Sequence, residues 1–286
     1  MKFLTPSENA VVKKDYNEAW SSMTVRVFST VLPAFTAVVL PIIFFIIIYN
    51  ISDTDTAAFR QITKLLPESA AAFGVKQKIF YCTVNFIFPI FFLLVPIMVA
   101  SAVSACCFAG ENERGTLETL FLTPLKPKRI FKAKFLGCIS FAAIVTALSF
   151  AAFSITVSIG DILLSMPFFI DWNWLIIFFI LTPAVLLFCT ALTAAAMCRG
   201  KGCFKSMQMS GYIATPLILL FLLQFTGLFV AGARTLLIAS LAVALADAAL
   251  VVAAEKSFVP QKLLFKPVKH FIIKKSLPGF IRKITM

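Results

Sequence analysis

Residues 27–49 read VFSTVLPAFTAVVLPIIFFIIIY, a run of 23 residues without a charged side chain. An apolar run of about 20 residues is long enough to cross a hydrocarbon core about 30 Å thick. Further predominantly apolar runs follow at residues 80–105, 135–158, 173–197, 209–231 and 235–254. The sequence therefore predicts an all-α, polytopic membrane protein with six transmembrane helices.

The composition of the chain excludes a soluble globular protein. Of its 286 residues 60% are hydrophobic and only 14% are charged, whereas soluble domains carry about 25% charged residues. The excess of apolar surface must face lipid. The formal net charge of +13 would also suit a nucleic-acid partner, but the cations lie beside the apolar runs, so we predict membrane lipid as the partner and no nucleic acid.

The distribution of Lys and Arg predicts how the chain is oriented. Both termini lie on one side of the membrane if the number of spans is even. Twenty-one of the 26 Lys and Arg residues lie in four segments that share that side, residues 1–26, 106–134, 199–205 and 255–286. Cytoplasmic loops carry such an excess of cations. We therefore expect a multi-pass protein of the cell inner (cytoplasmic) membrane with both termini cytoplasmic.

The first 26 residues are expected to precede the membrane domain as a separate helix. Apolar residues recur at helical spacing over residues 7–26, with Ser7 as a plausible N-cap. This face comprises Val12, Tyr16, Trp20, Met23 and Val27, and it opposes Lys13, Lys14, Asp15 and Glu18. Such an amphipathic helix lies in the membrane interface. The alternative is a polar leader that continues the first span.

The predicted domains are thus an interfacial helix at residues 1–26, a six-helix membrane domain at 27–254 and a basic cytoplasmic tail at 255–286. The tail interleaves eight Lys and Arg residues with Leu, Ile and Phe. This pattern suits the anionic inner leaflet. It also occurs in nucleic-acid binding segments, but a position next to a span favours the membrane surface.

The most informative polar stretch is residues 110–134, GENERGTLETLFLTPLKPKRIFKAK, within the loop at 106–134. We expect a first helix from Glu111, in which Arg114 is spaced to pair with Glu111 and with Glu118. Pro124 ends this helix, and Pro127 starts another that leads into the third span. Leu117, Leu120 and Phe121 form the apolar face of the first helix. The segment would offer a stiff knob to a soluble partner, or else be an ordinary solvated loop.

This segment resembles the membrane-spanning subunits of type-2 ATP-binding-cassette (ABC-2) exporters. In that family the loop after the second span reads approximately E-x-E-x-G-T-L-E-x-L-x-x-T-P, followed by a basic stretch and a Lys at the head of the third span. The matching residues here are Glu111, Glu113, Gly115, Thr116, Leu117, Glu118, Leu120, Thr123, Pro124 and then Lys134. The resemblance extends to the interfacial helix, the six spans and the cytoplasmic termini.

The resemblance implies that the segment is a coupling helix that docks on a nucleotide-binding ATPase subunit. The contact residues it implies are Glu111, Glu113, Arg114, Gly115, Thr116, Leu117, Glu118, Leu120, Phe121, Thr123 and Pro124. It also implies a second copy of the permease or a similar chain, giving a homodimer or a heterodimer. The family's re-entrant helices before the sixth span are hard to place here, because few residues, 231–234, separate the two runs.

The chain is expected to have no catalytic, cofactor or metal site of its own. It contains no phosphate loop; the nearest string, Arg199, Gly200, Lys201 and Gly202, lacks the upstream Gly and the hydroxyl residue. ATP and Mg would be bound by the partner subunit. The single His excludes an H-E-x-x-H zinc site, and the seven cysteines lack the ligand spacing of a zinc site.

Other functions remain possible from the sequence alone: a membrane-embedded enzyme, a transporter coupled to an ion gradient, or an immunity component that removes a peptide from the membrane. Asp247 is the one acid inside a predicted span. An intramembrane acid marks a functional hypothesis, here a position on the translocation path, although a structural role is equally open. A largely apolar bundle favours a lipophilic or amphipathic cargo such as a peptide, a drug or a lipid-linked molecule.

Overall fold

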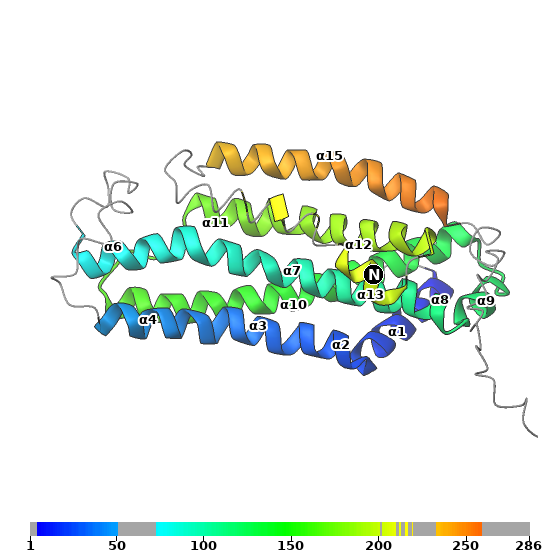
Figure 1. Cartoon of the computed structure of the whole chain (residues 1–286), viewed down its shortest axis with the longest axis horizontal. Helices are drawn as coiled ribbons and strands as arrows, with labels where there is room; N and C mark the ends of the chain where they lie inside the picture. The colour runs from blue at the N-terminus through cyan, green and yellow to red at the C-terminus, as the bar shows by residue number, and fades with distance from the viewer. Residues whose placement is uncertain are drawn as a thin grey trace, which may run out of the picture.

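The computed structural model (Figure 1) describes residues 5–50, 73–200, 202–209, 212, 215, 216, 219 and 233–258, and these residues contain helices and no strand. Helices long and apolar enough to cross a membrane occur at Met23–Asn50, Val75–Glu113, Pro127–Leu163, Trp172–Cys198 and Ala233–Ser257. They contain five of the six predicted runs, so an all-helical, multi-pass membrane protein is supported. The remaining run, 209–231, and the tail at 259–286 lie almost wholly outside the described residues.

The helices follow one another along the chain with short connections. After α1 (Pro6–Ser21), the first long helix comprises α2 (Met23–Arg26), η1 (Val27–Val31), α3 (Leu32–Ala34), η2 (Phe35–Val39) and α4 (Leu40–Asn50). The second comprises α6 (Val75–Cys82), η4 (Thr83–Ile87), α7 (Phe88–Ser104), η5 (Ala105–Gly110) and α8 (Glu111–Glu113). Then come α9 (Thr116–Phe121), α10 (Pro127–Leu163), α11 (Trp172–Ile176), η6 (Ile177–Leu181), α12 (Thr182–Cys198), α13 (Cys203–Gln208) and α15 (Ala233–Ser257).

Prolines widen the long helices without ending them. A proline has no N–H group, and its ring crowds the carbonyl four residues earlier. A π-type turn directly before the proline accommodates both effects within a continuous helix. Four such segments each end two residues before a proline: η1 before Pro33, η2 before Pro41, η4 before Pro89 and η6 before Pro183.

The second long helix lies at the centre of the described bundle. Its most apolar stretch is the most buried of the five long helices, and α7 contacts both α10 and α12. Aromatic rings fill the space between them; the ring centroids of Phe153 and Trp174 lie 5.1 Å apart. The outer face of α10 instead exposes a stripe of isoleucine and leucine, Ile144, Leu148, Ile155 and Ile159. This stripe suits contact with lipid.

The N-terminal helix differs from the prediction in its extent and in the face it buries. It ends at Ser21, and Ser22 adopts an extended conformation before α2 begins. Its N-cap is Thr5 and not Ser7; the Thr5 amide donates a hydrogen bond to the Glu8 carboxylate at 2.7 Å. The buried face contains Asp15 at 2% exposure, whereas Trp20 is 52% exposed. The predicted polar face is therefore partly the packed one.

Candidate functional site: a buried ion network

Three segments far apart in the sequence meet at one end of the bundle, where Figure 1 shows α1, α8 and α9. We call this the basic end. Helix α1 packs along the first part of α10 and also contacts η5, which leads into α8. The segment at residues 111–124, which the sequence singled out, therefore lies beside the N-terminal helix.

Lys134 is the centre of this junction. Its side chain is completely buried, and its Nζ lies 3.0 Å from Asp15 Oδ1 and 2.8 Å from Glu111 Oε2. The same ammonium donates a hydrogen bond to the Cys107 carbonyl oxygen at 3.1 Å. Lys134 belongs to the buried face of α10, with Ile130 one turn before it. It thus connects α10 with α1, η5 and α8 at a single point.

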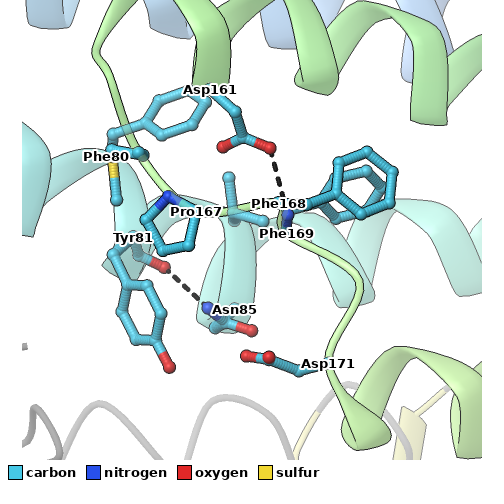
Figure 2. Close-up of a pocket in the computed structure, with 10 residues that line it drawn as sticks. Phe80, Tyr81, Asn85, Asp161, Pro167, Phe168, Phe169 and Asp171 are labelled. Carbon is cyan, nitrogen blue, oxygen red and sulfur yellow. Dashed lines mark hydrogen bonds between the residues drawn. The ribbon is translucent and has the colours of Figure 1, made fainter. Parts of the chain in front are cut away.

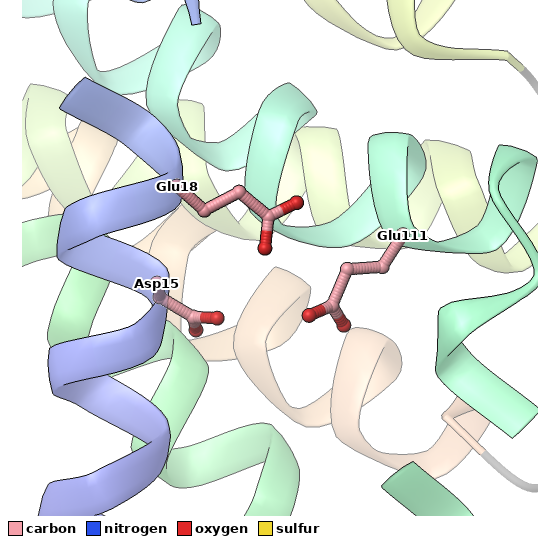
Figure 3. A group of neighbouring side chains, drawn as sticks. All are labelled: Asp15, Glu18 and Glu111. Atoms are coloured by element: carbon pink, nitrogen blue, oxygen red, sulfur yellow. The ribbon is translucent and has the colours of Figure 1, made fainter. Parts of the chain in front are cut away.

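Two further ion pairs surround this centre. Lys14 Nζ lies 2.5 Å from Glu111 Oε1, and Arg114 pairs with Glu18. Figure 3 shows the carboxylates of Asp15, Glu18 and Glu111 directed toward one another, the first two from α1. An oxygen from each lies within 4.8 Å of the others.

Acidic groups at this spacing resemble the ligands of a metal ion, but three cations of the chain, Lys14, Arg114 and Lys134, already balance the three carboxylates. The Lys134 ammonium also occupies the position between Asp15 and Glu111. We therefore interpret the arrangement as a neutral ion network and assign no metal to it.

Burial makes the network sensitive to the loss of any member. It raises the pKa of the Asp15 carboxyl above its ordinary value, and the attraction of Lys134 opposes this rise. Asp15 Oδ2 has no hydrogen-bond partner among the described residues, so its charge depends on Lys134. Removing one partner of a buried ion pair typically costs about 3–5 kcal/mol. The network therefore holds the three segments in one arrangement.

The segment at residues 111–121 is not one helix, as the sequence predicted. Gly115 adopts a φ of +72° and separates α8 from α9. A residue with a Cβ is strained in this left-handed region, which explains the need for glycine. The predicted pairs of Arg114 with Glu111 and Glu118 are also wrong, because Arg114 pairs with Glu18 and Glu111 pairs with Lys134 and Lys14.

The apolar face of the segment packs inside the chain. Leu117 is 1% exposed and Leu120 is 9% exposed, so neither faces solvent as a partner contact would require. Phe121 packs on Phe258 at the end of α15, with ring centroids 5.5 Å apart. Glu113 Oε1 accepts a hydrogen bond of 2.7 Å from the Cys203 amide at the start of α13. The segment is thereby attached to α13 and to the end of α15 as well.

A solvent-exposed ridge remains on the other side of the segment. The exposed residues of the predicted set are Glu113, Arg114, Gly115, Thr116, Glu118, Thr123 and Pro124, whereas Glu111, Leu117 and Leu120 are buried and Phe121 is half-buried. Leu122, absent from the predicted set, is 85% exposed. It follows Glu118 by four residues, which places the two on one face. We call Glu118, Thr119, Leu122, Thr123 and Pro124 the exposed ridge.

Asp247 does not join this network. It lies ten residues before the end of α15, about 15 Å along the helix axis, and it is buried where α15 packs on α12. Both carboxylate oxygens lack a hydrogen-bond partner among the residues that the structure describes. The predicted run at 209–231 is outside that part of the chain, so the role of Asp247 stays a prediction.

The opposite end of the bundle holds a small pocket of about 70 Å³ (Figure 2). Its wall includes Tyr81, Asn85, Asp161 and Asp171. Asp161 Oδ2 accepts a hydrogen bond of 3.0 Å from the Phe169 amide, so this carboxylate orders the connection between α10 and α11. Because ligand pockets usually measure about 300–1,000 Å³, the pocket is too small for a lipophilic cargo.

Comparisons of the chain with protein-family models, with curated proteins and with solved structures gave no match. The fold and the site define a class: an all-helical protein with several helices able to cross a membrane, and with an ion network that attaches a polar segment to them. The function must be argued from that segment and its attachments.

Proposed function

We propose that this chain is the membrane-spanning subunit of an ABC-2-type exporter, driven by an ATPase on a separate polypeptide. The observation that carries the proposal is the segment at residues 111–124. It matches the family's coupling segment in sequence, and it is attached to α1, α10, α13 and α15 while its ridge stays exposed. A segment that transmits force requires both features.

The attachments explain how movement of a docked ATPase would reach the membrane helices. A push on the ridge is transmitted through Glu111 to Lys134, which heads the apolar part of α10, and through Arg114 to Glu18 of α1. Separating the buried Lys134 pairs costs about 3–5 kcal/mol. The segment, α1 and α10 therefore move together, and displacement of the ridge becomes displacement of the helices.

The rest of the proposed assembly follows from the sequence. Lys and Arg on and around the basic end would place it in the cytoplasm, with α1 in the membrane interface and both termini on that side. The undescribed run at 209–231 would be the remaining span. A second permease copy or a similar chain would complete the path, and the cargo would be lipophilic or amphipathic, because isolated charges are costly in a dry path.

Asp247 supports an alternative, a transporter driven by an ion gradient. A buried carboxylate inside a span, with no hydrogen-bond partner among the described residues, is the kind of group that binds a coupling proton or ion. We place this alternative second because Asp247 is the one acid inside the predicted spans, whereas the matched segment and its attachments involve many residues.

ATP hydrolysis tests the proposal and separates it from the alternative. The verified-pure chain is expected to hydrolyse no ATP, because it has no phosphate loop, and to support hydrolysis once a second polypeptide is bound. In vesicles that contain both, an uncoupler that abolishes the proton gradient should leave ATP-dependent activity unchanged. Hydrolysis by the pure chain alone, or transport that stops with the uncoupler, would contradict the proposal.

A further inference from the structure

An open groove lies between α1 and α10 at the basic end, on the same side as the exposed stripe of α10. Its volume is about 610 Å³. Residues of α1 and α2 form one wall and residues of α10 form the floor: Tyr16, Asn17, Trp20 and Arg26 on the wall, Phe141, Ile144 and Leu148 on the floor. The ion network and the exposed ridge use none of these side chains.

Close packing of the two helices on one side of the groove fixes its shape. Gly137 allows α1 to approach α10, since a Cβ there would lie 3.6 Å from Val12. The Tyr16 hydroxyl lies 3.2 Å from the Ser140 hydroxyl, and the Tyr16 ring meets the Phe141 ring edge-on with centroids 5.2 Å apart. The chain then bends at Ser22, where the backbone is extended. The groove is therefore a built feature of this bend.

The two ends of the groove differ in chemistry. Its floor is apolar and continues into the exposed stripe through Ile144 and Leu148. At its mouth, Arg26 donates hydrogen bonds of 3.3 Å to the carbonyl oxygens of Trp20 and Ser21. A guanidinium group has five N–H donors, so donors remain for a ligand, and no carboxylate within the described residues pairs with Arg26. An occupant must combine an anionic group with an apolar chain.

We propose that this groove binds a phospholipid with an anionic headgroup, its phosphate on Arg26 and one acyl chain along Ile144 and Leu148. Arginine suits phosphate because its planar donors match the oxygens, and exposed Trp20 and Tyr16 suit the headgroup level of a membrane. The volume lies in the usual range of ligand sites. This proposal depends on the membrane location of the helices and not on an ATPase partner.

Quenching of tryptophan fluorescence by brominated lipid tests the proposal. The purified chain is placed in phosphatidylcholine vesicles that contain a minor share of brominated phosphatidylglycerol or, for comparison, brominated phosphatidylcholine. A Trp20→Phe variant measures the background of Trp172 and Trp174. We expect the quenching that depends on Trp20 to show a preference of about fivefold for the anionic lipid, the value for about 1 kcal/mol from one cation.

Matched variants separate a site from a diffuse attraction. Arg26→Gln should make the two brominated lipids equivalent. Because that change also removes two hydrogen bonds, Asn17→Asp provides a second test: it leaves Arg26 in place, adds an anion to the groove and should also abolish the preference. Lys13→Gln removes an exposed charge from α1 outside the groove and should leave the preference intact.

Two results would overturn the proposal. One is an equal response of the wild-type chain to both lipids, or an equal loss in Lys13→Gln and Arg26→Gln, because surface charge alone would then explain the binding. The other is protection of Trp20 from every brominated lipid, which a second copy of the chain covering the groove would produce.

Discussion

Lys134→Met is expected to lower the free energy of unfolding by about 3–5 kcal/mol, because it leaves Asp15 and Glu111 buried without their cation. Met has a similar length and fits an apolar site, so lost packing contributes little. The matched control is Lys132→Met on the exposed face of the same helix, where a change usually costs less than about 0.5 kcal/mol. Unfolding in mixed dodecyl sulfate micelles measures both.

A neutralised network should recover much of this loss. The triple variant Lys134→Met, Asp15→Asn and Glu111→Gln removes the buried charges together, and replacing a whole buried ion pair is often close to neutral. Lys14, the remaining partner of Glu111, is 47% exposed and can be hydrated. If Lys134→Met unfolds no more readily than Lys132→Met, the network does not hold the three segments together.

Glu118→Lys is expected to weaken the association with an ATPase subunit by at least about 30-fold without unfolding the chain. Glu118 is exposed on the ridge, and no ion pair within the described residues involves it. A mispaired charge in a desolvated interface costs about 2–5 kcal/mol, and 2 kcal/mol is about 30-fold. Recovery of the ATPase by the tagged variant, at equal abundance in the membrane, measures the effect.

Companion variants distinguish a contact from a structural defect. Glu118→Gln removes the charge without reversing it and should have a smaller effect, and Leu122→Ala should also weaken binding, because Leu122 is the exposed apolar residue of the ridge. Leu120→Asp should behave differently: Leu120 is buried, so this change should reduce the amount of the folded chain itself. Unchanged ATPase recovery for both Glu118→Lys and Leu122→Ala would remove the ridge from the interface.

The long helices could be predicted because each depends on its own residues. An uncharged apolar run such as residues 27–49 has few alternatives to a membrane helix, and five of the six runs coincide with helices of the structure. The segment at residues 111–124 was also recognisable, since Gly115, Pro124 and Pro127 act on the backbone locally. These features need no knowledge of which helices pack together.

The ion network could not be predicted, because its partners are distant in sequence. Asp15 and Lys134 are 119 residues apart. Helical spacing assigned Asp15 to the polar face of α1, and the rule for neighbours on one helix assigned Arg114 to Glu111 and Glu118. Tertiary packing overrides both, because a buried lysine on α10 requires acidic partners. Its one signal in the sequence was a Lys at the start of an otherwise apolar run.

The most direct test of the account is to purify the tagged wild-type chain from its native membrane and to identify the proteins bound to it. The account predicts a stoichiometric partner that contains a phosphate loop, and ATP hydrolysis by the purified complex. Purification of the folded chain without any such ATPase, under conditions that preserve other membrane complexes, would contradict it.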